Sequence, residues 1–143
     1  MNQSENPYRA PQGTDLTDSA NRMRIIEQLD VAESWKKRFR LIEKAGGEKL
    51  PRIKELSFGE RMSVGFNVWT MLFGVIYLLI KGMWKLALSY VAAAVLLSLA
   101  VSALEASGWK TGNALFFGLA AGFAAITNRH YYKKMVLGRS DWL

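Results

Sequence analysis

Residues 66–85 read FNVWTMLFGVIYLLIKGMWK, an apolar run that Gly74 interrupts and two lysines close. This run lies between two parts of the chain that differ in composition. Residues 1–61 hold most of the charged side chains, whereas residues 62–128 are mostly apolar. A soluble domain mixes polar and apolar residues along its whole length. The separation therefore predicts a membrane protein with a water-exposed N-terminal part.

The N-terminal part is predicted to be a disordered lead followed by a cytosolic helical arm. The lead, residues 1–16, is polar and contains proline and glycine. The arm, residues 17–61, begins with a helix that runs to Ala45, because Gly46 and Gly47 provide a stop signal. Apolar residues of this helix are spaced as on one helical face: Ile25, Leu29, Ala32, Phe39 and Ile42.

Part of the arm has the pattern of a contact surface. Trp35, Lys36, Arg38 and Phe39 place aromatic rings beside cations. This pattern is typical of an amphipathic helix that docks on a membrane surface or on a partner protein. The alternative is a helix that packs its apolar face on the rest of the protein.

Three apolar segments follow, at residues 62–80, 86–104 and 111–128. The second and the third contain no charged residue. At about 1.5 Å per residue, each is roughly 27 Å long, which is enough to cross the hydrocarbon core of a bilayer. The first segment is interrupted by Asn67 and Gly74, and it reaches the second with hardly any loop between them.

The positions of the cations decide between two topologies. If all three segments cross and the N-terminus is inside, the lysines of the 81–85 link and the basic tail face outward. If residues 62–85 bend at Gly74 and return, or lie on the inner face, every Lys and Arg except Lys110 stays inside. The second topology satisfies the positive-inside rule.

The sequence thus predicts an all-α membrane protein with two transmembrane helices, a glycine-bent re-entrant or interfacial hairpin and a cytosolic amphipathic helical arm. Both termini are expected in the cytoplasm, at a bacterial inner membrane. The predicted parts are a membrane domain at 62–134, with the hairpin at 62–85 and the spans at 86–104 and 111–128, and a basic cytosolic tail at 135–143.

Further candidate contact residues lie within the first apolar segment and at the ends of the segments, where aromatic and basic side chains meet lipid headgroups or a partner. They are Asn67, Gly74, Tyr77, Lys81, Trp84, Lys85, Asn128, Arg129, Tyr131 and Tyr132. Small residues on the two spans allow close helix packing, within one chain or between two copies. These are Ser98, Gly118 and Gly122.

No reaction chemistry is visible in the sequence. The chain has no cysteine and one histidine, His130, so the usual zinc sites are out of reach. No phosphate-binding glycine loop, serine–histidine pair or paired carboxylates occur. We therefore expect no enzyme, no cofactor and no metal. The basic residues beside apolar segments fit anionic lipid better than nucleic acid.

Three motifs occur together: WKxRF from Trp35, FNxxxxxFGxxYxxxKGMWK from Phe66 and NRxYY from Asn128. The combination resembles a domain-of-unknown-function family of small bacterial inner-membrane proteins. Many members have proline where this chain has Val75. The resemblance implies location and architecture, and it provides no catalytic or binding residues.

The function predicted from these patterns is a non-enzymatic inner-membrane protein that recruits or regulates a protein partner at the cytoplasmic face. Two alternatives remain. One is an immunity or exclusion protein that acts against a toxin or phage component. The other is an accessory subunit of a transporter, although two spans without an ionisable residue between them form a poor pathway.

Overall fold

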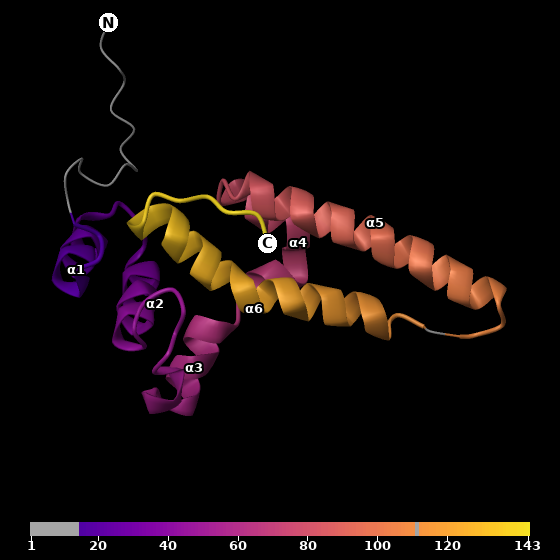
Figure 1. Ribbon diagram of the computed structural model, residues 1–143, viewed down its shortest axis with the longest axis horizontal. Helices are drawn as coiled ribbons and strands as arrows, with labels where there is room; N and C mark the ends of the chain where they lie inside the picture. The colour runs from indigo at the N-terminus through magenta and orange to yellow at the C-terminus, as the bar shows by residue number, and fades with distance from the viewer. Residues whose placement is uncertain (1–14, 111) are drawn as a thin grey trace, which may run out of the picture. The chain divides into compact units, whose positions relative to one another are not determined.

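The computed structural model describes residues 15–110 and 112–143, and all regular structure in that part of the chain is helical (Figure 1). This confirms the predicted all-α class. The predicted disordered lead lies almost entirely outside the described residues. The elements are α1 (Ser19–Gln28), α2 (Glu33–Lys44), a 3-10 turn (Ile53–Glu55), α3 (Phe58–Gly65), α4 (Val68–Ile80), α5 (Trp84–Ala106) and α6 (Ala114–Val136).

The chain divides into two compact units. The first contains the described residues up to Val64 together with Asn128–Ser140, and the second contains Gly65–Thr127 together with Asp141–Leu143. The last turns of α6 therefore belong to the first unit, with α1 and α2. Two segments that are far apart in the sequence share one core there.

The single helix predicted from residue 17 to Ala45 is wrong, because the structure has two helices with a break between them. Leu29 has extended backbone angles after α1, and α2 begins at Glu33. The break lets α1 pack against α2, so that apolar residues of both helices are buried in one core. A straight helix of that length would leave much of its apolar face in water.

The predicted stop at the end of α2 is confirmed. Gly46 and Gly47 have φ angles of 97° and 88°, in the region that glycine adopts without strain. The amide of Gly47 donates to the carbonyl of Ile42 at 2.9 Å, and the amide of Gly46 donates to that of Glu43 at 2.9 Å. These bonds satisfy helix-end carbonyls and turn the chain away from α2.

In the second unit, α4 is broken where the sequence predicts a bend. Its side-chain cap is Asn67, which accepts a hydrogen bond from the amide of Thr70 at 3.1 Å. Gly74 has φ 50° and ψ −124°, so the helix is interrupted there. Packing of Tyr90 on Phe123, with ring centroids 4.6 Å apart, connects α5 to α6 within this unit.

Two stretches are long and apolar enough to cross a membrane, as judged by length and composition: Phe58–Ile80 and Trp84–Ala106. The predicted span at 86–104 lies inside the second. Among the described residues, α6 does not meet this measure, because it begins at Ala114 and Thr127 and Asn128 end its apolar part. The first stretch instead overlaps the predicted hairpin, in residues 62–80.

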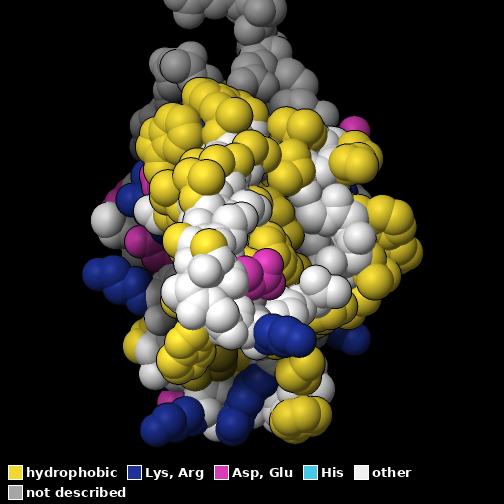
Figure 2. Space-filling model, turned by 90° about the vertical axis from the view of Figure 1, so that its right-hand side faces the viewer, with side chains coloured by type: hydrophobic (Ala, Val, Ile, Leu, Met, Phe, Trp, Pro, Cys, Tyr) yellow, Lys and Arg dark blue, Asp and Glu magenta, His cyan; other side chains and the backbone are white. Residues whose placement is uncertain are grey.

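Much of the apolar surface of these stretches is exposed. The most exposed large side chains include Leu72 at 67%, Ile80 at 76% and Leu96 at 67%. Figure 2 shows hydrophobic side chains over much of the face that it presents. Exposure on this scale is unfavourable in water and normal in lipid.

Candidate functional site

The first unit is built around a buried acidic side chain, Glu43, which is 5% exposed. Its carboxylate accepts a hydrogen bond from the Ser19 hydroxyl at 3.0 Å and from the Arg22 guanidinium at 2.8 and 3.1 Å. The hydroxyl of Tyr132, which is completely buried, also donates to it. Residues of α1, α2 and α6 thus converge on one carboxylate.

The interactions with Glu43 change the pKa values of its neighbours. Hydrogen bonding to Glu43 raises the pKa of the Arg22 guanidinium. Burial raises the pKa of the Tyr132 hydroxyl above its ordinary value of 10, and the hydrogen bond to Glu43 adds to the effect. Tyr132 therefore keeps its proton near neutral pH and acts as a donor.

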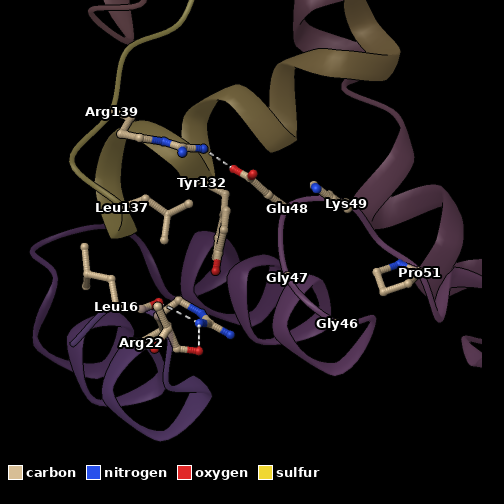
Figure 3. Close-up of a pocket in the computed structure, with 11 residues that line it drawn as sticks. Leu16, Arg22, Gly46, Gly47, Glu48, Lys49, Pro51, Tyr132, Leu137 and Arg139 are labelled. Carbon is tan, nitrogen blue, oxygen red and sulfur yellow. Dashed lines mark hydrogen bonds and ion pairs between the residues drawn. The ribbon is translucent and has the colours of Figure 1, made fainter.

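A pocket of about 460 Å³ lies directly beside this cluster (Figure 3). It is lined by Leu16, Thr17, Arg22, Gly46, Gly47, Glu48, Lys49, Pro51, Tyr132, Leu137 and Arg139. Arg22 lies on one side, where its Nη1 donates to the carbonyls of Leu16 and Thr17 at 2.7 and 2.8 Å. On another side, Arg139 forms an ion pair with Glu48 (Figure 3).

The lining combines three cations with aliphatic side chains and a tyrosine ring, which suits binding of a partly apolar group. Within the described residues, no group of three or more His, Cys, Asp and Glu side chains could hold a metal ion. The structure thus gives the first unit a pocket with a mixed charged and apolar lining. Its residues Arg22, Glu48 and Arg139 were missed by sequence reasoning, because the sequence gives no sign of which charged residues of the arm and the tail meet in space.

Two predicted contact residues of the arm lie in the core. Trp35 and Phe39 are 7% and 0% exposed, and the ring of Trp35 is 4.5 Å from that of Tyr131 between centroids. Tyr132 packs on Phe39 with centroids 5.9 Å apart. These rings pack the first unit together, as in the packing alternative considered for the arm.

The cations beside these rings, Lys36 and Arg38, are half-buried. The guanidinium carbon of Arg38 lies 4.5 Å from the centroid of the Trp35 ring. Lys36 donates to the carbonyl of Glu27 at 2.8 Å. Contact of Lys36 and Arg38 with a partner stays a prediction.

Two predicted contact residues, both asparagines, form side-chain hydrogen bonds with backbone groups at the ends of helices. The side chain of Asn128 is fully buried and donates to the carbonyls of Ser63 and Val64 at 3.0 and 3.1 Å. These carbonyls lie in the last turn of α3, so Asn128 satisfies groups that the helix leaves unpaired. The side chain of Asn67 caps α4, and the backbone N–H of Asn67 donates to the carbonyl of Ala124 at 2.9 Å. Arg129, beside Asn128, is half-buried.

The remaining predicted contacts gather around the α4–α5 connection. The Tyr77 hydroxyl accepts a bond of 3.4 Å from Asn67, and Nζ of Lys81 lies 5.9 Å from the Tyr77 ring. Trp84 packs edge-on against Trp142, with centroids 5.6 Å apart, and Nζ of Lys85 lies 5.8 Å from the Trp84 ring. Sequence reasoning missed Trp142, although an aromatic residue in a basic tail is itself a sign of a contact residue at the membrane surface.

The predicted packing residues are exposed in the single chain. The Ser98 hydroxyl donates to the carbonyl of Ala94 at 2.8 Å, along its own helix. Apart from the neighbouring residues and backbone of the same helix, no atom of the described residues lies within 4 Å of the position that a Cβ would take on Gly118 or Gly122. Close packing through these residues, including packing between two copies, stays a prediction.

Replacement of Glu43 by glutamine tests the importance of the buried carboxylate. Glu43→Gln leaves Arg22 without its counter-charge, and we expect a loss of about 3 kcal/mol in unfolding free energy. Urea unfolding of the full chain in detergent, followed by near-ultraviolet circular dichroism, measures it. Glu27→Gln is the matched control, because its ion pair with Arg40 is exposed and should matter little. Equal effects of both substitutions would contradict the assignment.

The raised pKa of Tyr132 predicts a pH dependence of stability. The protonated form is favoured in the folded state, so the stabilisation is complete below about pH 10 and is lost as the pH rises toward the folded pKa. The loss should approach roughly 1 kcal/mol per pH unit. Tyr132→Phe should have a flatter profile above pH 10 than the native chain. Parallel profiles would show that ionisation of this hydroxyl does not affect folding.

Comparison with known proteins identifies similar proteins and the family to which the chain belongs. The chain is similar to a protein of Escherichia coli named as the uncharacterised protein YigF, at 30% identity over 78% of this chain and 90% of the relative. It is also similar to a YigF protein of Salmonella typhimurium, at 27% identity over 82% of this chain and 94% of the relative. No solved structure matches. The model of a family of proteins of unknown function, DUF2628, matches residues 16–136, and the chain therefore belongs to the DUF2628 family.

Proposed function

We propose that this protein is a non-catalytic protein of the bacterial inner membrane, whose second unit lies in the bilayer and whose first unit recruits or regulates a protein partner at the cytoplasmic face. The observation that carries this proposal is the exposed apolar surface of α4 and α5. Side chains such as Leu72, Ile76 and Leu99 are more than half exposed in the single chain. Each would cost roughly 1.5–3 kcal/mol to keep in water rather than in an apolar medium.

The first unit has the opposite character, which supports a place in water. Its core contains Ile26, Phe39 and Ile42, all at 0% exposure. Its outer side chains form exposed ion pairs, such as the pair of Arg40 with Glu27 at 2.7 Å and with Glu33 at 2.9 Å. A polar exterior around an apolar core is the arrangement of a soluble domain.

For the membrane topology, we propose that α5 and α6 cross the bilayer and that α4 bends back at Gly74. The support is the distribution of charge, because this topology keeps Lys81, Lys85 and the basic tail on the cytoplasmic side. The apolar part of α6 is short for a full span, and such a helix crosses where the bilayer thins locally. The competing topology has Phe58–Ile80 and α5 as the two spans.

Partner binding is proposed for the pocket beside Glu43. The pocket opens on the first unit and contains charged groups on its lining, so a peptide segment with apolar and acidic side chains could enter it. Lys49 lies on this lining and is exposed. A partner bound here would contact α1, the end of α2 and the segment after α6 together.

Cysteine labelling tests the topology, and the cysteine-free chain provides a clean background. Single cysteines replace Trp84, Ser107 and Ser140, which are exposed. We expect a membrane-impermeant maleimide to label intact cells at Ser107→Cys alone, since only that loop faces outward. Labelling at Trp84→Cys alone would support Phe58–Ile80 and α5 as the spans. Labelling at both Trp84→Cys and Ser140→Cys would indicate three full spans and contradict the charge argument.

Photo-crosslinking tests the partner. A benzoyl-phenylalanine residue at Lys49 should give a discrete crosslinked protein band in living cells, because this position lines the pocket. The matched control is Lys54, an exposed lysine of the same unit outside the pocket lining. The same band pattern at both positions would show that the pocket is not where a partner binds, and absence of any band at either would count against recruitment.

A further inference from the structure

A groove runs along α5 beside the break in α4. It has a volume of about 320 Å³ and is lined by Val75 of α4 and by Tyr90, Val91, Ala94, Val95, Ser98 and Leu99 of α5. Tyr90 lies against Gly74, since a Cβ added to this glycine would be 3.6 Å from the Tyr90 hydroxyl oxygen. The break in α4 therefore lies at one end of the groove.

The groove continues as one exposed face of α5 toward the α4–α5 connection. Trp84, Leu88, Val91, Val95 and Leu99 follow each other at steps of three or four residues, which places them on one side of the helix. All five side chains are exposed. The face is about 22 Å long at 1.5 Å per residue, whereas one leaflet of hydrocarbon is about 15 Å thick. One extended acyl chain fits along it.

Cations lie at the end of this face. Lys81 follows the last residue of α4, and Lys85 lies in the first turn of α5. Nζ of Lys85 lies 5.8 Å from the ring of Trp84 and 6.0 Å from the ring of Trp142. Both tryptophan rings are half exposed, at 51% and 50%. Tryptophan beside lysine is the usual combination at the headgroup level of a membrane.

We propose that this surface is a binding site for one anionic phospholipid. The phosphate lies against Lys81 and Lys85, the rings of Trp84 and Trp142 lie at the depth of the glycerol, and one acyl chain fills the groove from Leu88 to Leu99. The proposal rests on the proposed place of the second unit in the membrane. It adds a defined lipid class and a defined position to it.

Charge complementarity favours an anionic lipid over a zwitterionic one. Two lysines, Lys81 and Lys85, lie at the connection. The second unit has one acidic residue near Trp142 in the sequence, Asp141. The other acid of the unit, Glu105, lies at the opposite end of α5, about 30 Å away along the helix. A basic end above an apolar groove attracts anionic headgroups. A small soluble anion would use the lysines and leave the groove empty.

Native mass spectrometry of the full chain in detergent tests the site. The probes are palmitoyl-oleoyl phosphatidylglycerol and palmitoyl-oleoyl phosphatidylcholine, added separately at equal concentration. We expect one retained phosphatidylglycerol per chain, with about tenfold preference over phosphatidylcholine. Lys81→Gln with Lys85→Gln should abolish the preference. Lys110→Gln, which removes a lysine from the other end of α5, should leave it unchanged.

A second variant tests the groove independently of charge. Val95→Trp fills the groove with a bulky apolar side chain, so retention of both lipids should fall while the circular dichroism spectrum stays native. Equal retention of both lipids by the native chain, or an unchanged preference in the double lysine variant, would overturn the proposal. Failure of the membrane location itself would be seen separately, as recovery of the protein in the soluble fraction of cells.

Discussion

The carboxylate of Glu43 joins parts of the first unit that are far apart in the sequence. It lies near the end of α2 and receives hydrogen bonds from Ser19 and Arg22 of α1 and from Tyr132 of α6. A buried carboxylate is unfavourable unless its lone pairs are occupied and its charge is balanced, and these three donors meet both needs. Because the donors come from separate helices, the carboxylate requires all of them at once. The pocket beside it exists only where these helices meet.

The second unit depends on backbone constraints rather than on charge. Asn67 caps α4, Gly74 interrupts it, and Tyr90 of α5 packs against the interruption. Without a side chain, Gly74 adopts a positive φ that other residues reach only with strain. The break shapes the groove on α5 and leaves the lysines and tryptophans of the connection at one end of it. An apolar surface with one basic, aromatic end is suited to a lipid leaflet.

In the function that we propose, the two units therefore have different roles. One presents a charged pocket built on a compact core, and the other presents apolar helices with an anionic-lipid site at their connection. The chain passes from the first to the second at the end of α3, returns within α6 and passes once more before Asp141. A lipid at the connection and a partner at the pocket would bind to different units of one chain.

Local features of the fold were readable from the sequence, because each depends on residues that are neighbours in the chain. Examples are the all-α class, the stop at Gly46 and Gly47, and the break at Gly74. Features that join distant segments were not readable. Nothing in the spacing of the arm showed that α1 and α2 separate, or that Glu43 pairs with Arg22 and receives the hydroxyl of Tyr132. Helical periodicity and glycine geometry are local properties, whereas the choice of which charges and rings are buried together is made by the packing of the whole unit. The sequence by itself determined the all-α class and the separation of polar from apolar segments, and only the tertiary structure decided the pocket, the groove and the residues that line them.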